Sequence, residues 1–407
     1  MSPLQPLAPP PTKLGRYRQL SPRAAIHVSP LSLGGMSLGD KWDLGEMNKE
    51  SSIKLLDAYY DAGGNFIDTA NFYQDGSSEE VIGEWMVKRK NRDQMVIATK
   101  YANYTHNGNP DIAQRVNFTG SNTKSMKLSL ESSLERFQTT YIDLFYVHWW
   151  DGYTLVEEMM DALHNLVVSG KVLYLGVSNF PAWLVAKANG YARANGKTPF
   201  VVYQGEYSIL KRDLETEIIP MCQHEDMGVI AYGTLASGRI RTTDEENRRI
   251  QSGEGGRSLM RPDWQRRPEE VKVCDGLEEL AKKIGAKSIG AGNVPFPFDL
   301  LELKKNLRLF VFVSMFYLVA IAYALQKSQY FFPILGGRKV EHLLQNLEAL
   351  DITLTPEHIK FLDDLNPLKL AFPYNIFGLQ GYPFVFTAHA HLDGIPHPTP
   401  IQPAKDS

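Results

Sequence analysis

Four polar side chains, each at or just after the end of an apolar run, have the types needed to protonate a carbonyl oxygen. Asp68 and Tyr73 lie in "FIDTANFYQDGSSEEVIGEWM", Lys100 ends "QMVIATK" and His148 ends "IDLFYVH". A phenol titrates near ~10, and a nearby ammonium lowers its pKa. A carboxylate keeps a buried ammonium charged. We therefore predict that Asp68 and Lys100 make Tyr73 a general acid, while His148 donates a hydrogen bond to the same carbonyl oxygen.

Each of these residues also has a structural interpretation when it is taken alone. Asp68 is of a type that caps the turn at 69–72, and Tyr73 is of a type that packs half-buried. Lys100 resembles a solvated strand end, and His148 beside two tryptophans resembles a satisfied core histidine. The conjunction of four such groups on consecutive strand ends favours catalysis, because packing alone does not explain it.

The rest of the chain alternates apolar runs with segments of helical spacing, which predicts parallel strands. Eight runs have strand character: 28–35, 65–70, 94–100, 142–148, 172–179, 200–206, 228–233 and 330–337. Eight units favour an α/β fold of the closed (β/α)8, or TIM, barrel type, whose active site lies where the strands end. A doubly wound sheet is the rival, but "LSLGGMSLGDKW" lacks the G-x-G-x-x-G of its phosphate loop.

Two local features accompany the predicted barrel. A β-hairpin from "YRQL" through "AAIHVSP" is expected to plug the floor of the barrel. Ser77 and Glu80 have the spacing of a capping box that opens the helix after the second strand.

Composition narrows the function classes. The 407 residues carry a formal net charge of −3 with both signs interspersed, which disfavours a nucleic-acid partner. The two cysteines lack a CxxC spacing, so we expect no metal site or disulfide and a reducing, cytoplasmic compartment. Residues 1–15 are proline-rich without the apolar core of a secretion signal and are interpreted as a flexible leader.

The order and spacing of several motifs resemble the aldo-keto reductase superfamily over roughly residues 15–370. These motifs are "NFIDTANFYQDGSSEEVIGEWM", "VIATKY", "YIDLFYVHWWD", "GVSNF" and "FPILGGRKVEHLLQNLEAL". "GDKW", "HWWD" and "ILGGRK" are similar to its fungal aryl-alcohol dehydrogenase branch, which includes norsolorinic acid reductases. The resemblance implies a catalytic tetrad of Asp68, Tyr73, Lys100 and His148, with Tyr73 as the proton donor, NADPH as the hydride source and an aromatic aldehyde or ketone as substrate.

The same resemblance implies the residues that bind the small molecules. His148 and Trp149 match substrate-binding positions. The cofactor-binding positions are Asp68, Ser178, Asn179, Gln204, Tyr232, Gly233, Leu235, Ser237, Arg239, Gly336, Arg338, Lys339, His342, Gln345 and Asn346. Arg338 and Gln345 depart from the serine and glutamate that relatives often carry. Two cations at a helix start still suit a 2′-phosphate, so we expect NADPH rather than NADH; a solvated helix entry is the alternative interpretation.

One segment departs from the family pattern more strongly. Relatives run almost directly from a helix like "GLEELAKKIGAKSI" into one like "VAIAYALQKS", whereas residues 290–318 stand between them here. Leu309 to Leu325 are uncharged, at the short end of the ~17–25 residues of a membrane span. We interpret 290–318 as a translated intron or another gene-model error, which leaves "VAIAYAL" as an ordinary barrel helix and no membrane partner. A genuine insertion that forms a lid or a membrane-association loop is the alternative.

These observations divide the chain into a leader, a barrel over 16–370 with the insertion at 290–318, and a tail over 371–407 that we expect to pack over the barrel mouth. The leading function is NADPH-dependent reduction of an aromatic carbonyl compound, reversible with the alcohol, in fungal secondary metabolism. The alternatives are a nucleotide-binding regulatory subunit of the potassium-channel β type and an inactive product of a disrupted chain. The exact substrate, the physiological direction and the oligomeric state, a homo-oligomer included, stay open.

Overall fold

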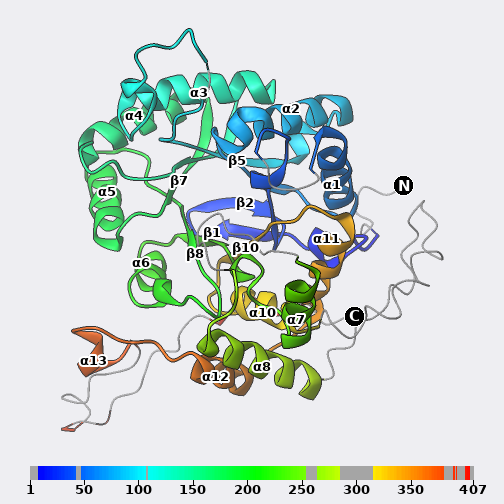
Figure 1. Ribbon diagram of the computed structural model, residues 1–407. Helices are drawn as coiled ribbons and strands as arrows, with labels where there is room; N and C mark the ends of the chain where they lie inside the picture. The colour runs from blue at the N-terminus through cyan, green and yellow to red at the C-terminus, as the bar shows by residue number, and fades with distance from the viewer. Residues whose placement is uncertain are drawn as a thin grey trace.

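The computed structural model describes residues 8–42, 47–106, 109–253, 264–284, 315–379, 388–389, 391 and 399–403. Eight parallel strands close into a barrel in the order β10-β3-β4-β5-β6-β7-β8-β9 (Figure 1). The strands are β3 Ser32–Gly34, β4 Phe66–Asp68, β5 Val96–Tyr101, β6 Ile142–Val147, β7 Val172–Ser178, β8 Val202–Glu206, β9 Gly228–Tyr232 and β10 Phe331–Leu335. The predicted (β/α)8 barrel is confirmed, with one strand in each of the eight apolar runs.

Helices surround this barrel (Figure 1). The α-helices are α1 Lys49–Asp61, α2 Ser77–Arg89, α3 Thr123–Phe137, α4 Val156–Val168, α5 Ala182–Ala194, α6 Ile218–His224, α7 Thr243–Ser252, α8 Pro268–Lys283, α10 Met315–Leu325, α11 Val340–Leu347, α12 Pro356–Leu365 and α13 Tyr374–Phe377. The 3-10 helices are η1 Lys13–Gly15, η2 Gly35–Ser37, η3 Tyr73–Gly76, η4 Arg92–Gln94, η5 Val116–Phe118, η6 Asp213–Glu215, η7 Ala236–Gly238 and η8 Glu348–Asp351. Within the described parts of the chain, no helix is long and apolar enough to cross a membrane.

Side chains of the strands alternate between two cores, as the period of two in a barrel strand requires. In β6, Leu144 and Tyr146 belong to the interior core, whereas Phe145 and Val147 pack outward under the helices. Phe66 and Ala98 are interior as well. Asp68 and Lys100 lie two residues further along their strands, so the same alternation points both side chains into the barrel near its carboxyl-terminal end.

The predicted hairpin closes the opposite end of the barrel. Strands β1 (Arg18–Ser21) and β2 (Ala24–Val28) pair antiparallel. Leu20, Ala24 and Val28 are fully buried in the interior core. A Cβ added to Gly228, the first residue of β9, would fall 2.4 Å from the Leu20 carbonyl oxygen. The hairpin therefore lies directly under the start of the strands, and its plugging role is confirmed.

The start of α2 differs from the prediction. Its N-cap is Gly76, in the left-handed conformation with φ 95°, and no side chain caps the helix there. Ser77 instead donates a hydrogen bond from Oγ to the Gln74 carbonyl oxygen at 2.9 Å. The predicted Ser77–Glu80 capping box is therefore wrong, because Ser77 already lies inside the helix.

The expected leader, insertion and tail are only partly described. Leu14, in the predicted leader, is fully buried, and Thr12 Oγ1 bonds to the Ala62 carbonyl oxygen at 2.7 Å, so this stretch packs on the end of α1. Residues 290–314 of the expected insertion lie outside the described residues, but residues 315–318 form the first turn of α10, where Phe316 and Leu318 are buried.

The described part of the tail near the barrel does not show the expected packing over the mouth. Phe372 is 77% exposed, and α13, with its half-exposed Ile376 and Phe377, stands apart from the helices that surround the barrel (Figure 1). Residues 380–387, 390, 392–398 and 404–407 lie outside the described residues. For those parts, the packing of the tail stays a prediction.

Candidate active site

The four side chains predicted to act together gather at the carboxyl-terminal end of the barrel. The Lys100 ammonium donates to Asp68 Oδ1 at 2.7 Å and to the Thr69 carbonyl oxygen at 2.6 Å. Lys100 is fully buried and Asp68 is 3% exposed. The ammonium lies 5.2 Å from the centroid of the Tyr73 ring, which is 6.1 Å from the His148 ring centroid. The predicted tetrad is thus one contiguous cluster.

A strained turn holds Tyr73 in this cluster. After β4, the chain continues beside β5, with the Asn71 N–H donating to the Lys100 carbonyl oxygen at 3.1 Å. Gln74, Asp75 and Gly76 then follow with φ of 54°, 52° and 95°. Left-handed conformations cost energy in residues other than glycine. These conformations turn the chain directly into α2. Tyr73 therefore stays at the carboxyl-terminal end of the barrel, beside Lys100.

The side chain of Gln74 ties this turn to the loop after β3. Gln74 is 1% exposed; its Nε2 donates to the Met36 carbonyl oxygen at 3.1 Å, and its Oε1 accepts from the Trp42 N–H at 2.7 Å. The Trp42 ring lies 5.5 Å from the Phe72 ring and 6.4 Å from the Tyr73 ring, centroid to centroid. The buried amide therefore fixes aromatic side chains around the tyrosine.

The pKa of Tyr73 shifts in the direction opposite to the prediction. Burial raises the pKa of Tyr73 well above its ordinary value, and the Asp68 carboxylate and Tyr232 add to the rise. Burial also lowers the pKa of Lys100, and Asp68 opposes that shift. The expectation that Lys100 lowers the pKa of Tyr73 is wrong for this arrangement. The ammonium is bound to Asp68 and the Thr69 carbonyl oxygen, so its charge is largely compensated and the burial of the phenol dominates.

His148 is a neutral imidazole at this site. Burial, followed by the positive charge of Lys100, holds the pKa of His148 well below its usual range. The ring of Trp149 stacks on His148 with centroids 5.4 Å apart and planes at 12°. Trp149 is 42% exposed, so it covers the histidine from the solvent side. The lowered pKa therefore favours an uncharged ring that is able to donate or accept a hydrogen bond.

The residues predicted to hold a nicotinamide adjoin the tetrad. Gln204 is buried and donates from Nε2 to Asp68 Oδ2 at 2.8 Å. Asn179 donates from Nδ2 to Ser178 Oγ at 2.9 Å and accepts from the Tyr232 hydroxyl at 2.9 Å. Asn179 has φ 58°, a left-handed conformation that turns its amide back toward β7. Amide, hydroxyl and aromatic groups thus stand together beside Tyr73, the chemistry that a nicotinamide carboxamide and ring require.

The positions predicted to bind the phosphates follow β9 and β10, which are neighbours in the barrel. Gly233, Leu235 and Ser237 lie in the loop after β9, where Arg239 already pairs with Glu270 at 3.7 Å. Of the others, Gly336, Arg338 and Lys339 precede α11, His342 lies in its first turn, and Gln345 and Asn346 lie in its last turn.

The start of α11 has the features of an anion site. No side chain caps this helix, and a Cβ added to Gly336 or Gly337 would meet open space. Arg338 and Lys339 are exposed there, and their charges contribute, after burial, to a lowered pKa of His342. Free N–H groups at a helix start together with cations favour an anion, so these residues fit a phosphate group.

Two residues of the cluster were missed by sequence reasoning. Tyr146 lies beneath Lys100, whose ammonium is 5.7 Å from its ring centroid, and the alternation along β6 was enough to place it inside the barrel. Asn103 contacts His148 from the loop after β5. No sequence signal places Asn103 there, since its position depends on the conformation of that loop.

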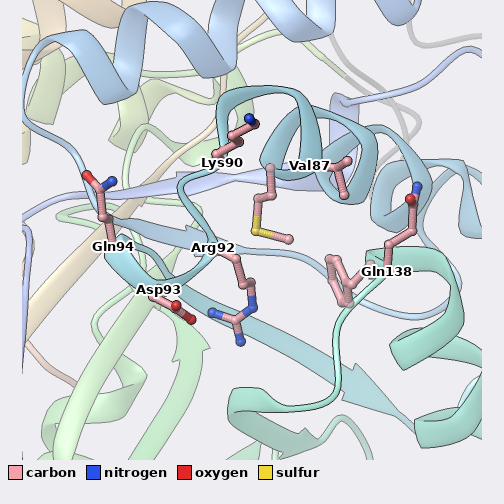
Figure 2. Close-up of a pocket in the computed structure, with 8 residues that line it drawn as sticks. Val87, Lys90, Arg92, Asp93, Gln94 and Gln138 are labelled. Carbon is pink, nitrogen blue, oxygen red and sulfur yellow. The ribbon is translucent and has the colours of Figure 1, made fainter.

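A separate pocket of about 400 Å³ lies away from the tetrad, where α2 and α3 end and just before β5 begins (Figure 2). Val87, Lys90, Arg92 and Gln138 are among its lining residues. Arg92 is already engaged by Asp143 at 2.8 Å. Among the described residues, no group of His, Cys, Asp and Glu side chains is arranged to hold a metal ion. None of the four tetrad residues lines this pocket.

Comparison with known proteins decides the family. The model of the aldo/keto reductase family matches residues 30–291 and 315–367, most of the chain. The chain belongs to the aldo/keto reductase family. The break in the match, 292–314, falls within the stretch that departs from the family pattern.

Individual relatives of this aldo/keto reductase are fungal. An aryl-alcohol dehydrogenase [NADP(+)] of Phanerodontia chrysosporium is 52% identical over 98% of this chain and 99% of its own length. A putative aryl-alcohol dehydrogenase, AAD14, of Saccharomyces cerevisiae is 44% identical over 92% of this chain and 93% of its own. Norsolorinic acid reductase A of Aspergillus parasiticus is 42% identical over 98% and 96%. The predicted resemblance to this branch is confirmed.

Proposed function

We propose that this aldo/keto reductase is an NADPH-dependent enzyme that reduces an aromatic aldehyde or ketone to the alcohol, reversibly, with Tyr73 as the general acid. The observation that carries the proposal is the buried Lys100–Asp68 pair beside the ring of Tyr73. The ammonium bonds to Asp68 and to the Thr69 carbonyl oxygen and lies 5.2 Å from the centroid of the Tyr73 ring, so a cation and a carboxylate stand beside the phenol. Names of relatives, an NADP(+)-dependent aryl-alcohol dehydrogenase among them, support the same chemistry.

The proton in this reaction comes from the tyrosine. Because its pKa is raised, Tyr73 stays protonated at neutral pH and is ready to donate. The substrate carbonyl oxygen accepts hydrogen bonds from the Tyr73 hydroxyl and from the neutral imidazole of His148, which together orient it. When the O–H bond of Tyr73 breaks, its proton goes to the carbonyl oxygen and its electron pair stays on the phenolate. The Lys100 ammonium, 5.2 Å from the ring centroid, offsets part of the negative charge that develops there, although Asp68 compensates much of its own charge.

The chain also offers the groups that a bound NADPH needs. When bound, NADPH supplies the hydride that becomes attached to the carbonyl carbon. Ser178, Asn179 and Gln204 carry the hydroxyl and amides for the carboxamide, and Tyr232 supplies an aromatic face. Arg338 and Lys339 at the start of α11 suit a 2′-phosphate, which favours NADPH over NADH.

The surroundings of the tetrad favour an aromatic substrate. Trp42 and Phe72 pack against each other beside Tyr73, and Trp149 covers His148. Flat apolar rings gain from offset or edge contacts with such side chains.

A cytoplasmic location and a role in secondary metabolism are part of the same proposal. The free, buried Cys222 and Cys274 support a reducing compartment, and the norsolorinic acid reductase relatives support the metabolic role.

The test is turnover by a Tyr73→Phe variant. We expect wild-type protein to oxidise NADPH in the presence of aromatic aldehydes, and the variant to lose about 10²–10⁴-fold in kcat, the usual contribution of a general acid. Binding of NADPH, followed by its fluorescence, should be unchanged, because only the hydroxyl is removed. Tyr153→Phe is the matched control, since Tyr153 is 90% exposed and lies outside the cluster.

The outcomes separate the alternatives. If wild-type protein binds NADPH but turns over none of the aldehydes, a nucleotide-binding regulatory subunit of the potassium-channel β type is favoured. If wild-type protein neither binds NADPH nor shows turnover, an inactive product of a disrupted chain is favoured. Full turnover by the Tyr73→Phe variant would show that the acid lies elsewhere.

A further inference from the structure

A side-chain amide from the loop after β5 contacts the imidazole ring of His148. Asn103 Nδ2 lies 3.0 Å from His148 Nδ1. An amide nitrogen only donates hydrogen bonds, so Nδ1 must be the acceptor. A neutral imidazole carries one N–H, and when Nδ1 accepts, that N–H is on Nε2.

The backbone before Asn103 is constrained in a way that aims this amide. Ala102 has φ 99°, a conformation that residues other than glycine rarely adopt. Its carbonyl oxygen accepts from the Gly120 N–H at 2.9 Å and from Thr119 Oγ1 at 2.8 Å. The next carbonyl oxygen, of Asn103, accepts from Asn71 Nδ2 at 3.3 Å. Hydrogen bonds from the far end of the loop and from Asn71, which follows β4, thus hold Ala102 and Asn103 in the conformation that places the Asn103 amide against the histidine.

We propose that Asn103 is a positioning residue that holds His148 in the Nε2–H tautomer, so that the neutral ring donates a hydrogen bond to the substrate carbonyl oxygen. This inference rests on the proposed carbonyl reduction and adds to it a residue that does not contact the substrate. With the opposite tautomer, Nε2 would present a lone pair to the carbonyl oxygen and repel it.

The charged and titratable groups around His148 fit this role. Lys100 faces it from β5 and Tyr73 from η3, while Asp68 is bound to Lys100. The remaining neighbours are the rings of Phe72 and Trp149 and the amide of Asn179, which donates to the His148 carbonyl oxygen at 3.3 Å. Burial and Lys100 both keep the imidazole uncharged, so its tautomer decides whether it donates, and the Asn103 amide sets that tautomer.

An Asn103→Asp variant tests the proposal with little change of shape. A carboxylate accepts a hydrogen bond from Nδ1–H, which inverts the tautomer, and its negative charge raises the pKa of His148. Above that pKa the neutral ring presents its lone pair to the substrate; below it, the imidazolium carries a proton on both nitrogens and donates again. We therefore expect kcat/KM for aldehyde reduction to drop at least about 10-fold at pH 8 and to recover as the pH falls. Wild-type protein should show no such acid-side recovery.

Asn195→Asp is the matched control. Asn195 is exposed at the end of α5, where its amide donates to the Tyr191 carbonyl oxygen at 2.9 Å. This variant adds the same charge away from the site and should keep the wild-type pH profile. If Asn103→Asp instead loses activity equally at every pH, Asn103 has a purely structural role and the proposal is wrong.

A spectroscopic readout separates this inference from the proposed function. In the 15N spectrum of histidine-labelled protein, we expect His148 to show a protonated Nε2 and an unprotonated Nδ1, and the Tyr73→Phe variant to show the same pattern. A His148→Asn variant identifies the resonance. A protonated Nδ1 in wild-type protein contradicts the role of Asn103 even if the enzyme is active. The expected tautomer in a protein without turnover contradicts only the proposed reaction.

Discussion

Among single residues, Tyr73 determines how the reaction responds to pH. An acid acts only while it is protonated, and burial together with Asp68 raises the pKa of Tyr73 above its ordinary value. The proton therefore stays bound as the pH rises through the neutral range. In the reverse direction the same group must accept a proton, so the oxidation of the alcohol requires the phenolate and gains from higher pH.

The raised pKa of Tyr73 predicts different pH profiles for aldehyde reduction and alcohol oxidation. Between about pH 6 and about pH 8.5, kcat/KM for aldehyde reduction should stay level, whereas kcat/KM for alcohol oxidation should rise with pH. Initial rates measured from absorbance at the NADPH band, with saturating cofactor in each direction, check both profiles. A fall of the reduction rate with a midpoint below about pH 8 contradicts the raised pKa of Tyr73.

Residue types and spacing were sufficient to place the tetrad but not to set its electrostatics. Asp68, Lys100 and His148 each lie two residues after an interior position of a barrel strand. Because strand side chains alternate with a period of two, their convergence was predictable. The direction of the Tyr73 pKa was not, because it depends on how deeply the turn at Gln74–Gly76 buries the phenol. Asn103 was not predictable either, since the conformation of Ala102 that aims it has no signature in the sequence.

Among the strands and helices, β6 and β7 pack closely at a position where β7 carries a glycine. Gly176 is paired in register with Tyr146. A Cβ added to Gly176 would fall 2.4 Å from Cε1 of the Tyr146 ring. The fully buried ring therefore occupies the space beside β7 and forms a floor under Lys100. The glycine of "GVSN" is required here by close packing, not by backbone conformation.

A Gly176→Ala variant tests this packing. Overpacking of a closed core costs about 1–3 kcal/mol, so we expect a loss of that size in the free energy of unfolding, measured by urea denaturation. Tyr146→Leu in the same chain should recover much of the loss by removing the ring. Gly190→Ala is the matched control: Gly190 lies in α5 with open space around it, and alanine there should be neutral or stabilising. Equal stability of Gly176→Ala and wild-type protein contradicts the close contact.

In the whole molecule, α8 and α10 pack against each other outside the barrel, although the chain between them departs from the family pattern. Every residue of α10 from Leu318 to Leu325 is buried. Tyr323 donates to Asp363 Oδ1 at 2.6 Å, and Gln326, just after the helix, donates to the Ile352 carbonyl oxygen at 2.8 Å. α10 is thus part of the core. The uncharged segment from Leu309 to Leu325 therefore contains a buried barrel helix. This is the role that the sequence predicted for its "VAIAYAL" half.

The boundaries of the unusual segment lead to a prediction about the whole chain. Residues 292–314 lie outside the family match, so their deletion tests the interpretation of this segment as a gene-model error. A chain without them should keep the melting temperature and the NADPH binding of the full chain. A chain without 290–318 should be less stable, because it also loses the buried Phe316 and Leu318, each contributing about 1.5–3 kcal/mol, and the Tyr317 hydrogen bond to Glu245.

Thermal melting of the three chains, followed by NADPH titration, decides between the origins of this segment. If the shorter deletion melts like the full chain and transcripts lack its codons, the segment is a translated intron or another gene-model error. A lower melting temperature or a weaker NADPH affinity of the shorter deletion shows instead that the segment is a genuine insertion. Transcripts that retain the codons support the same conclusion. The longer deletion is the internal control, because buried apolar side chains at the start of α10 must stabilise the barrel whichever origin is correct.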